Sequence, residues 1–258
     1  EGVKELILVA QDSSRYGEDL DKPDALAHLL RELSHTDGIE WVRVMYTYPT
    51  HISDGFLDVL AEEPKAVKYL DMPLQHASQN VLKLMKRGGN RASLERLIER
   101  VRSRVPGIAV RTTFITGFPG ETEENFNELL SFVRNVEFDR VGVFTYSDEE
   151  GTPAFDLPNK VDPKIAKRRR DRLMKEQSKV AKRKHDAMIG QTVRVMFEGE
   201  SNESELLWQG RTETQAPDID GCVLINDVPE DFKPAPGELV NVLITEALDY
   251  DILGRIVD

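Results

Sequence analysis

Polar and aromatic side chains directly follow five apolar runs in the first 152 residues of the sequence. The five junctions read AQDSSRYG (10–17), YTYPTH (46–51), MPLQHAS (72–78), TGFPGET (116–122) and TYSDEEGT (145–152). If the runs are parallel strands joined by helices, their carboxyl ends meet at one edge of a sheet, where such proteins place their chemistry. Five such junctions fit a binding mouth better than five unrelated caps. The side chains expected there are Gln11, Asp12, Tyr46, Gln75, His76, Arg111, Tyr146 and Glu149.

The fourth junction contains a tight turn whose composition restricts the ligand. Gly117 and Gly120 have no Cβ, so the backbone can approach a bound molecule closely, and Pro119 stiffens the turn. A helix is expected to begin beside Thr122, whose hydroxyl can cap it, with Glu121, Glu123 and Glu124 in its first turn. Those carboxylates would compete with a phosphate, and the lysine of a P-loop is missing. The turn favours a neutral or zwitterionic ligand with a flat group of adenine size, and a plain strand-to-helix turn is the alternative.

Other kinds of site find little support in the sequence. His76 has no second histidine or carboxylate at metal-ligand spacing, so no metal site is expected there. A nucleophilic triad is also unsupported, because G-x-S-x-G is absent and Cys222 falls in an expected β-strand. Cys222 is the only cysteine, which excludes disulfides within the chain and favours a cytosolic setting.

Charge is distributed unevenly along the chain. Residues 190–258 hold 4 basic and 15 acidic side chains, and thus −11 of the total net charge of −12. Such a surface repels nucleic-acid phosphates and attracts basic partners. The basic run KRRRDR (167–172) could indicate nucleic-acid binding. Its helix carries apolar residues on other faces, so a solvated helix face is the favoured interpretation.

The pattern of apolar residues predicts an α/β domain followed by a small all-β domain. Strands are expected at 5–10, 41–49, 67–74, 109–116 and 141–147, and helices at 24–34, 55–63, 79–88, 94–105 and 124–136. This alternation predicts a parallel sheet. A long helix over 163–190, capped by Asp162 and ended by Gly190, comes next. Five short strands at 192–200, 206–215, 221–227, 238–247 and 253–258 predict a closed β-barrel, with the domain boundary near residue 189. No apolar run is long enough to span a bilayer, so no membrane partner is expected.

Taken in order, several of these segments resemble the radical S-adenosylmethionine methylthiotransferases. The resemblance rests on AQDSSRYG, MPLQHASQNVLKLMKRG, FITGFPGETEENF, VFTYSDEEGTPA and RRDRLMKEQ, followed by a small barrel similar to a TRAM domain. Arg111, Glu149, Glu150 and the tail ALDYDILGRI are similar to one branch of that family. That branch methylthiolates the β-carbon of an aspartate in a small-subunit ribosomal protein. Members that modify transfer RNA typically have Arg and Pro at the two glutamate positions.

The resemblance implies a fold, a chemistry and a partner. Residues 1–189 would form a partial TIM-like (β/α) barrel of the radical SAM type without its first strand, and residues 190–258 an OB-like TRAM barrel. The full-length enzyme would cleave S-adenosylmethionine to a 5′-deoxyadenosyl radical and would carry two 4Fe–4S clusters. Its partner would be a basic small-subunit ribosomal protein or the ribosomal subunit in the cytoplasm, docked through the acidic TRAM domain. Direct binding of transfer RNA is not expected.

By motif position, the resemblance also implies residues that bind S-adenosylmethionine, while it leaves catalytic residues unassigned. The first junction would contact the methionine portion, and the third would lie near the ribose and the active centre. The glycine turn and the strand before it would lie beside the adenine and the polar groups of the ligand. The implied positions are Gln11, Asp12, Gln75, His76, Arg111, Ile115, Gly117, Phe118 and Tyr146.

The sequence departs from the family at its cysteines. Family members hold one cluster on a C-x-x-x-C-x-x-C loop and the second on an N-terminal domain, and neither segment is present. The sequence is therefore interpreted as a fragment that binds no cluster and is inactive by itself. Three alternatives stay open: a transfer-RNA methylthiotransferase, a barrel enzyme without redox chemistry, and an inert module that docks on the ribosome.

We expect the 258-residue chain, treated with iron and sulfide without oxygen, to hold no iron–sulfur cluster, because Cys222 alone cannot supply the thiolates. Iron analysis and the visible absorption spectrum measure this. A Cys222→Ser variant is the control and is expected to give the same spectrum. Stoichiometric iron in the unaltered chain would contradict the prediction.

Overall fold

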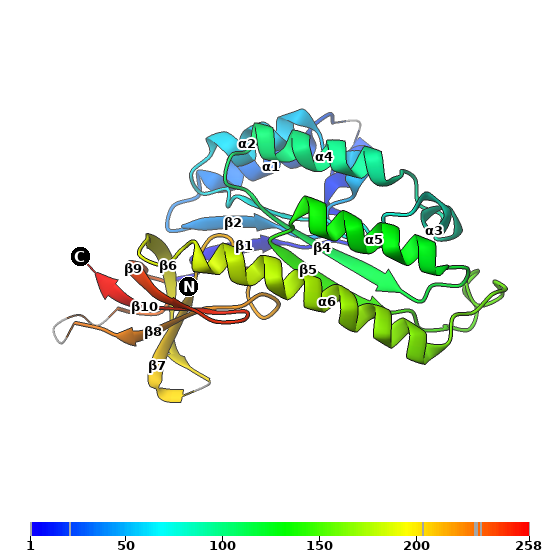
Figure 1. The fold of residues 1–258 in the computed structure, drawn as a ribbon. Helices are drawn as coiled ribbons and strands as arrows, with labels where there is room; N and C mark the ends of the chain where they lie inside the picture. Colours follow the sequence, from blue (N-terminus) through cyan, green and yellow to red (C-terminus); the bar gives the residue numbers. More distant parts are fainter. Residues whose placement is uncertain (1, 21, 203, 230–231, 233, 258) are drawn as a thin grey trace.

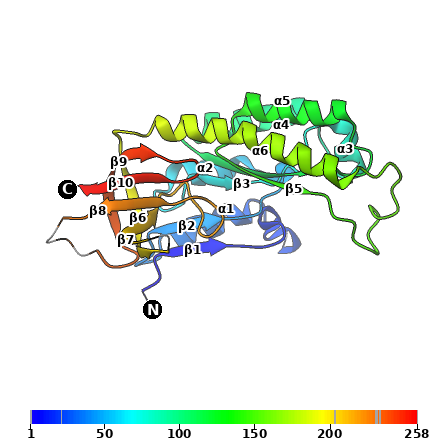
Figure 2. The same cartoon turned by 60° about the horizontal axis from the view of Figure 1, so that its bottom comes forward.

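A computed structural model describes residues 2–20, 22–202, 204–229, 232 and 234–257. Parallel strands with helices packed against them form the larger part, and a small β-barrel lies toward the amino ends of those strands (Figure 1). The loop that joins the last parallel strand to the long helix lies at the opposite end (Figure 2). The strand carboxyl ends therefore face away from the small barrel.

All five expected strands of the larger part are present and run parallel in sequence order. They are β1 (Glu5–Leu8), β2 (Trp41–Val44), β3 (Tyr69–Asp71), β4 (Ala109–Thr116) and β5 (Arg140–Thr145). The expected parallel arrangement is confirmed, and the ladder pairing divides into β1–β2 and β3–β4–β5. A parallel bridge between Val42 and Ala66 links the two groups, as does a hydrogen bond from the amide of Thr47 to the carbonyl of Asp71 at 2.9 Å.

The helices alternate with these strands as expected, and local capping explains their bounds. They are α1 (Ala25–Ser34), α2 (Asp54–Glu62), α3 (Gln79–Leu84), α4 (Arg91–Arg104), α5 (Glu123–Val136) and α6 (Pro163–Asp186), with short 3₁₀ turns η1 (Ser13–Arg15), η2 (Glu18–Leu20) and η3 (Pro49–His51). Thr122 caps α5 by accepting from the amide of Asn125, 3.3 Å away, as the sequence predicted. The expected helix over 79–88 stops early, since Lys86 adopts φ +56°. Helix α6 ends four residues before Gly190.

No helix in the described residues is long and apolar enough to cross a membrane.

The two faces of the parallel strands have different partners. One face packs Val42, Leu70 and Phe114 against the helices in the main hydrophobic core. The other face carries Trp41 and Tyr69 near the amino ends of the strands, where they pack against Ala216, Met196 and Leu239 of the small barrel. Strand side chains alternate between faces. The same alternation that builds the core therefore sends every second side chain toward the small barrel or the strand-end mouth.

The small domain is a closed five-stranded barrel, as the sequence predicted. Its strands are β6 (Thr192–Ser201), β7 (Ser204–Arg211), β8 (Val223–Asp227), β9 (Leu239–Ala247) and β10 (Ile252–Val257), in the order β10-β8-β7-β6-β9. Strand β7 ends at Arg211 rather than at the expected residue 215. Beyond it the chain leaves the barrel, and Gln215 and Ala216 are buried beneath the parallel strands. This connection, residues 212–222, is called the β7–β8 connection below.

A buried carboxylate joins the two parts. Glu5 of β1 accepts from Arg43 Nε at 2.8 Å and from Arg211 Nη2 at 2.7 Å. Arg43 is fully buried and also donates to the carbonyl of Glu213 at 2.9 Å. Because buried charges are costly unless paired, Glu5 holds strands β1, β2 and β7 together.

We expect Glu5→Gln to lower the free energy of unfolding by about 3 kcal/mol, because two buried guanidinium groups lose their shared counter-charge. Glu40→Gln is the matched control, since the Glu40–Lys4 pair is 4.0 Å long and about a third exposed. That control should cost less than about 0.5 kcal/mol. Urea unfolding followed by circular dichroism measures both, and equal effects would contradict the assigned role of Glu5.

Candidate functional site

A cavity of about 580 Å³ opens at the carboxyl ends of the parallel strands. Five of the nine predicted ligand-binding residues line it: Gln11, Gln75, Arg111, Ile115 and Tyr146. Tyr46, which the sequence also placed at the mouth, is a further lining residue, as are Thr47, Tyr48, Pro73, Arg87, Thr113, Phe144, Thr145 and Ser147. The volume lies in the range of small-molecule sites. Four of the five strand-end junctions contribute to this one cavity.

Two lining residues have unusual backbone conformations. Tyr46 has φ +55° and Gln75 has φ +68°, a region that side-chain-bearing residues seldom occupy. Backbone hydrogen bonds hold Gln75 in this conformation. Its amide donates to the carbonyl of Thr113 at 2.8 Å, and its carbonyl accepts from the amide of Ile115 at 2.8 Å. Such conformations persist only where surrounding contacts enforce them, and they cluster at binding sites.

A buried ion pair forms the floor of the cavity. Arg111 Nη1 lies 2.8 Å from Asp71 Oδ1, and Asp71 Oδ2 accepts from the amide of Tyr46 at 3.0 Å. Asp71 is fully buried. Burial by itself would lower the pKa of Arg111, but Asp71, Tyr69 and Asp220 together outweigh it, so that pKa is raised and the guanidinium stays charged. Asp71 was not predicted, although a charged residue inside the apolar run VKYLDMPL was the available signal.

A second guanidinium and several aromatic rings line the cavity wall. Arg87 lies 4.9 Å from the centre of the Tyr48 ring and donates to the carbonyl of Pro73 at 3.2 Å. Phe144 is 60% exposed and Tyr46 is 46% exposed, so flat apolar surfaces are open to a ligand. Arg87 was also missed, because it follows α3 rather than a strand. Cationic groups beside open rings suit a ligand with a carboxylate and a planar ring system.

Two of the remaining predicted residues lie close to the cavity without lining it. Asp12 caps the turn η1 by accepting from the amide of Ser14 at 3.1 Å, and its other oxygen lies 3.1 Å from His51 Nδ1. Phe118 is buried and meets the ring of Tyr146 edge-on, with ring centres 5.0 Å apart. Phe118 therefore packs against Tyr146, which lines the cavity.

His76 belongs to a buried network beneath the glycine turn. The amide of Ser78 donates to His76 Nδ1 at 2.9 Å, so Nε2 is the nitrogen that faces Glu121, 3.3 Å away. Glu121 also accepts from Arg169 Nη1 at 3.0 Å and from the amide of Gly117. All three side chains of this network are at least 94% buried. Glu121 lies before the helix cap rather than in the first turn of α5, where the sequence placed it.

The structure adds a packing role to residues of two sequence motifs. A Cβ on Gly117, whose φ is +80°, would lie 2.3 Å from the Cβ of Ala166 in α6. Gly117 thus provides room for helix α6, a role that the sequence did not predict, while the predicted approach of its backbone to a ligand stays a prediction. The predicted solvated helix face of KRRRDR holds for Lys167, Arg168, Asp171 and Arg172, which are exposed. Arg169 is the exception, because it is 5% exposed and faces Glu121 instead of solvent.

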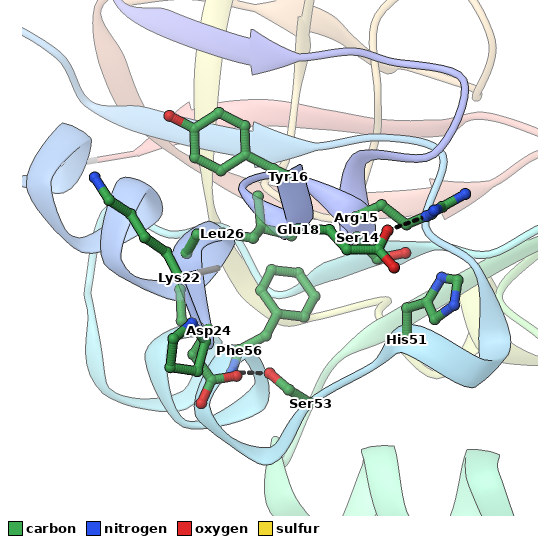
Figure 3. A pocket seen from close by; sticks show the side chains of 13 residues that line it. Ser14, Arg15, Tyr16, Glu18, Lys22, Asp24, Leu26, His51, Ser53 and Phe56 are labelled. Atoms are coloured by element: carbon green, nitrogen blue, oxygen red, sulfur yellow. Dashed lines mark hydrogen bonds and ion pairs between the residues drawn. The ribbon is translucent and has the colours of Figure 1, made fainter. Parts of the chain in front are cut away.

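Another cavity, of about 490 Å³, lies between η1 and the starts of α1 and α2 (Figure 3). Figure 3 shows Phe56 among its lining residues, with Lys22 and Asp24 on one side and His51 on another. Arg15, also on its wall, is paired with Glu18. None of the nine predicted residues lines this cavity, so the cavity at the strand ends remains the candidate site.

The described residues hold no group of three or more metal-ligating side chains. Cys222, the only cysteine of the sequence, is the last residue of the β7–β8 connection, and its amide donates to Asp251 Oδ1 at 2.7 Å. The residues present therefore do not fit an iron–sulfur cluster, which takes several thiolates.

Comparison with protein families assigns both parts of the chain. The profile of the Radical SAM superfamily matches residues 1–133, which is more than half of the sequence. The chain belongs to the radical SAM superfamily. The TRAM domain profile matches residues 189–257. The expected combination of a radical SAM barrel and a TRAM barrel is therefore confirmed.

Curated relatives extend the match over the whole chain. The chain is 48% identical over 256 residues to the "Ribosomal protein uS12 methylthiotransferase RimO" of Koribacter versatilis, covering 99% of this chain and 51% of that protein. It is 48% identical to the protein of the same name from Anaeromyxobacter sp. (strain K), covering 100% and 54%. The predicted resemblance to the RimO type of methylthiotransferase is confirmed. The chain spans about half the length of these relatives.

Among solved structures, the coproporphyrinogen III oxidase HemN of Escherichia coli, named a radical SAM enzyme, is 14% identical to this chain. The structural match covers 73% of this chain and 50% of the HemN chain, with a TM-score of 0.46.

We expect Gly117→Ala to destabilise the fold by more than about 3 kcal/mol, because it adds a clash with Ala166 to the cost of a positive φ. Gly107→Ala is the matched control, since Gly107 has φ +82° and nothing within 4 Å of the added methyl group. That variant should cost about 1 kcal/mol. Thermal and urea unfolding measure the difference, and equal losses would show that α6 does not need the glycine.

Proposed function

We propose that the strand-end cavity binds S-adenosylmethionine, and that the whole protein is a methylthiotransferase acting on ribosomal protein uS12. The proposal extends to the β-carbon of an aspartate in uS12 as the modified atom. The observation that carries it is the 48% identity over 99% of this chain to a relative with that named activity. The cavity adds independent support, because it lies where the resemblance expected the ligand.

The chain contributes binding and orientation. Arg87 and Arg111 give the cavity two guanidinium groups suited to a carboxylate, and the rings of Phe144 and Tyr146 offer flat surfaces suited to adenine. Phe118 braces Tyr146, and Asp71 fixes Arg111. These contacts would hold S-adenosylmethionine in one orientation and keep water from much of its surface.

Two 4Fe–4S clusters, which the family uses to cleave S-adenosylmethionine and to supply sulfur, would be held by cysteines outside these 258 residues. We further propose residues 1–189 and 190–258 as the two domains, the first binding S-adenosylmethionine and the second docking the protein substrate.

The small barrel has the charge for docking a basic protein. Its described surface exposes seven carboxylates: Glu200, Glu205, Asp218, Asp227, Glu238, Glu246 and Asp249. The exposed bases in the same described residues are Arg194 and Arg255. A surface of this sign accelerates encounter with a cationic protein and repels transfer RNA.

The test uses the complete gene product, purified without oxygen. We expect it to contain iron and sulfide, and to release 5′-deoxyadenosine from S-adenosylmethionine faster when uS12 and a reductant are present. Stimulation by transfer RNA in place of uS12 would favour the RNA-modifying alternative. Iron-free protein without cleavage would leave a docking module as the better account.

Arg87→Gln tests the cavity directly. The variant should weaken S-adenosylmethionine binding by roughly tenfold, the size expected for one charge-assisted hydrogen bond. Arg168→Gln, an exposed arginine on α6, is the control and should bind as the unaltered protein does. Calorimetry on the cluster-loaded protein measures both dissociation constants. Equal affinities for the two variants would indicate that S-adenosylmethionine does not bind in this cavity.

A further inference from the structure

A chain of buried polar contacts runs from the small barrel to the strand-end cavity. Asp220 of the β7–β8 connection has its Oδ1 3.6 Å from Arg111 Nε. Arg111 contacts Asp71 at 2.8 Å, and Asp71 accepts from the amide of Tyr46 at 3.0 Å. Arg111 and Tyr46 both line the cavity. The side chains of Asp71 and Asp220 are 0% and 2% exposed and that of Arg111 is 13% exposed, so water screens these interactions only weakly.

Asp220 is held firmly in this position. Its Oδ2 accepts from the hydroxyl of Tyr69 at 2.6 Å and from the amide of Ala216 at 2.9 Å. Burial, followed by the neighbouring Asp220 carboxylate, raises the pKa of Tyr69 and keeps its phenol a donor. Ala216 itself is buried against the parallel strands. The carboxylate therefore has little freedom to follow a movement of Arg111.

Arg111 lies between two carboxylates from different domains. The guanidinium forms one ion pair with Asp71 of strand β3 and another with Asp220 of the β7–β8 connection. A guanidinium shared between two fixed carboxylates keeps one position. If Asp220 lost its charge, Arg111 would be free to pair more closely with Asp71, whose second oxygen holds Tyr46 at φ +55°.

We propose that Asp220 is a positioning residue for the ligand-binding cavity, through which the TRAM domain fixes Arg111 and, by way of Asp71, the backbone of Tyr46. The inference rests on the proposed function only in naming S-adenosylmethionine as the ligand. The small barrel thereby takes part in building the cofactor site in addition to any docking role.

The first test reads the side chains themselves. Asp220→Asn keeps one carbonyl oxygen that can accept from both Tyr69 and Ala216 but removes the charge, and Asp218→Asn changes an exposed neighbour in the same connection. In isotope-labelled chain, the Arg111 Nε–H signal is identified by its loss in Arg111→Gln. We expect Asp220→Asn to shift this signal and the Tyr46 amide signal, while Asp218→Asn shifts neither. A loss of thermal stability with both signals unmoved would reduce Asp220 to a structural role and overturn the proposal.

The second test is a double-mutant cycle on S-adenosylmethionine binding by the cluster-loaded gene product. Asp220→Asn should raise the dissociation constant about fivefold or more. In an Arg111→Gln background it should have no further effect, because Asp220 acts through Arg111. Additive effects would overturn the proposal. Failure of the unaltered protein to bind S-adenosylmethionine would instead refute the proposed function, and the signal shifts would still decide the role of Asp220.

Discussion

Two guanidinium groups, on the face of the parallel strands that meets the small barrel, are the constraint on which the arrangement of the molecule depends. Arg43 and Arg111 each need carboxylate or carbonyl partners, because an unpaired buried charge would cost several kcal/mol. The strands supply Glu5 and Asp71, and the small barrel supplies the Glu213 carbonyl and Asp220. The two domains are thus joined by polar contacts that neither could complete alone.

These polar contacts divide that face of the strands into two regions, one covered by the small barrel and one that lines the cavity. Near the amino ends of the strands, Trp41 and Tyr69 pack against the small barrel and exclude solvent. Beyond Arg111, the same face widens into the cavity that Gln75 and Ile115 line. Arg111 forms the boundary, since it contacts the small barrel on one side and the cavity on the other. The position of the TRAM barrel and the shape of the strand-end cavity therefore both depend on the contacts of Arg111.

The glycine turn shows that one motif can carry a structural role that its sequence does not reveal. The resemblance to the family depended partly on GFPGETE, and the family assignment is confirmed. The sequence predicted a close approach of the glycine backbone to a ligand, and the structure shows that Gly117 also makes room for Ala166 of α6. Buried Glu121 and Arg169 then fasten that helix to the turn. The turn shapes the cavity indirectly, by fixing the end of β4 against α6.

The sequence by itself determined the alternation of strands and helices, the small closed barrel and the location of the mouth, because these follow from local periodicity and from residues adjacent to each strand. It could not decide which side chains at a strand end enter the cavity. Gln75 lines it, while its neighbour His76 turns into the core, since successive side chains point to opposite faces. Asp220 was beyond prediction, because its partner Tyr69 is 151 positions away in the sequence. Only the packing of one domain against the other decides such pairs.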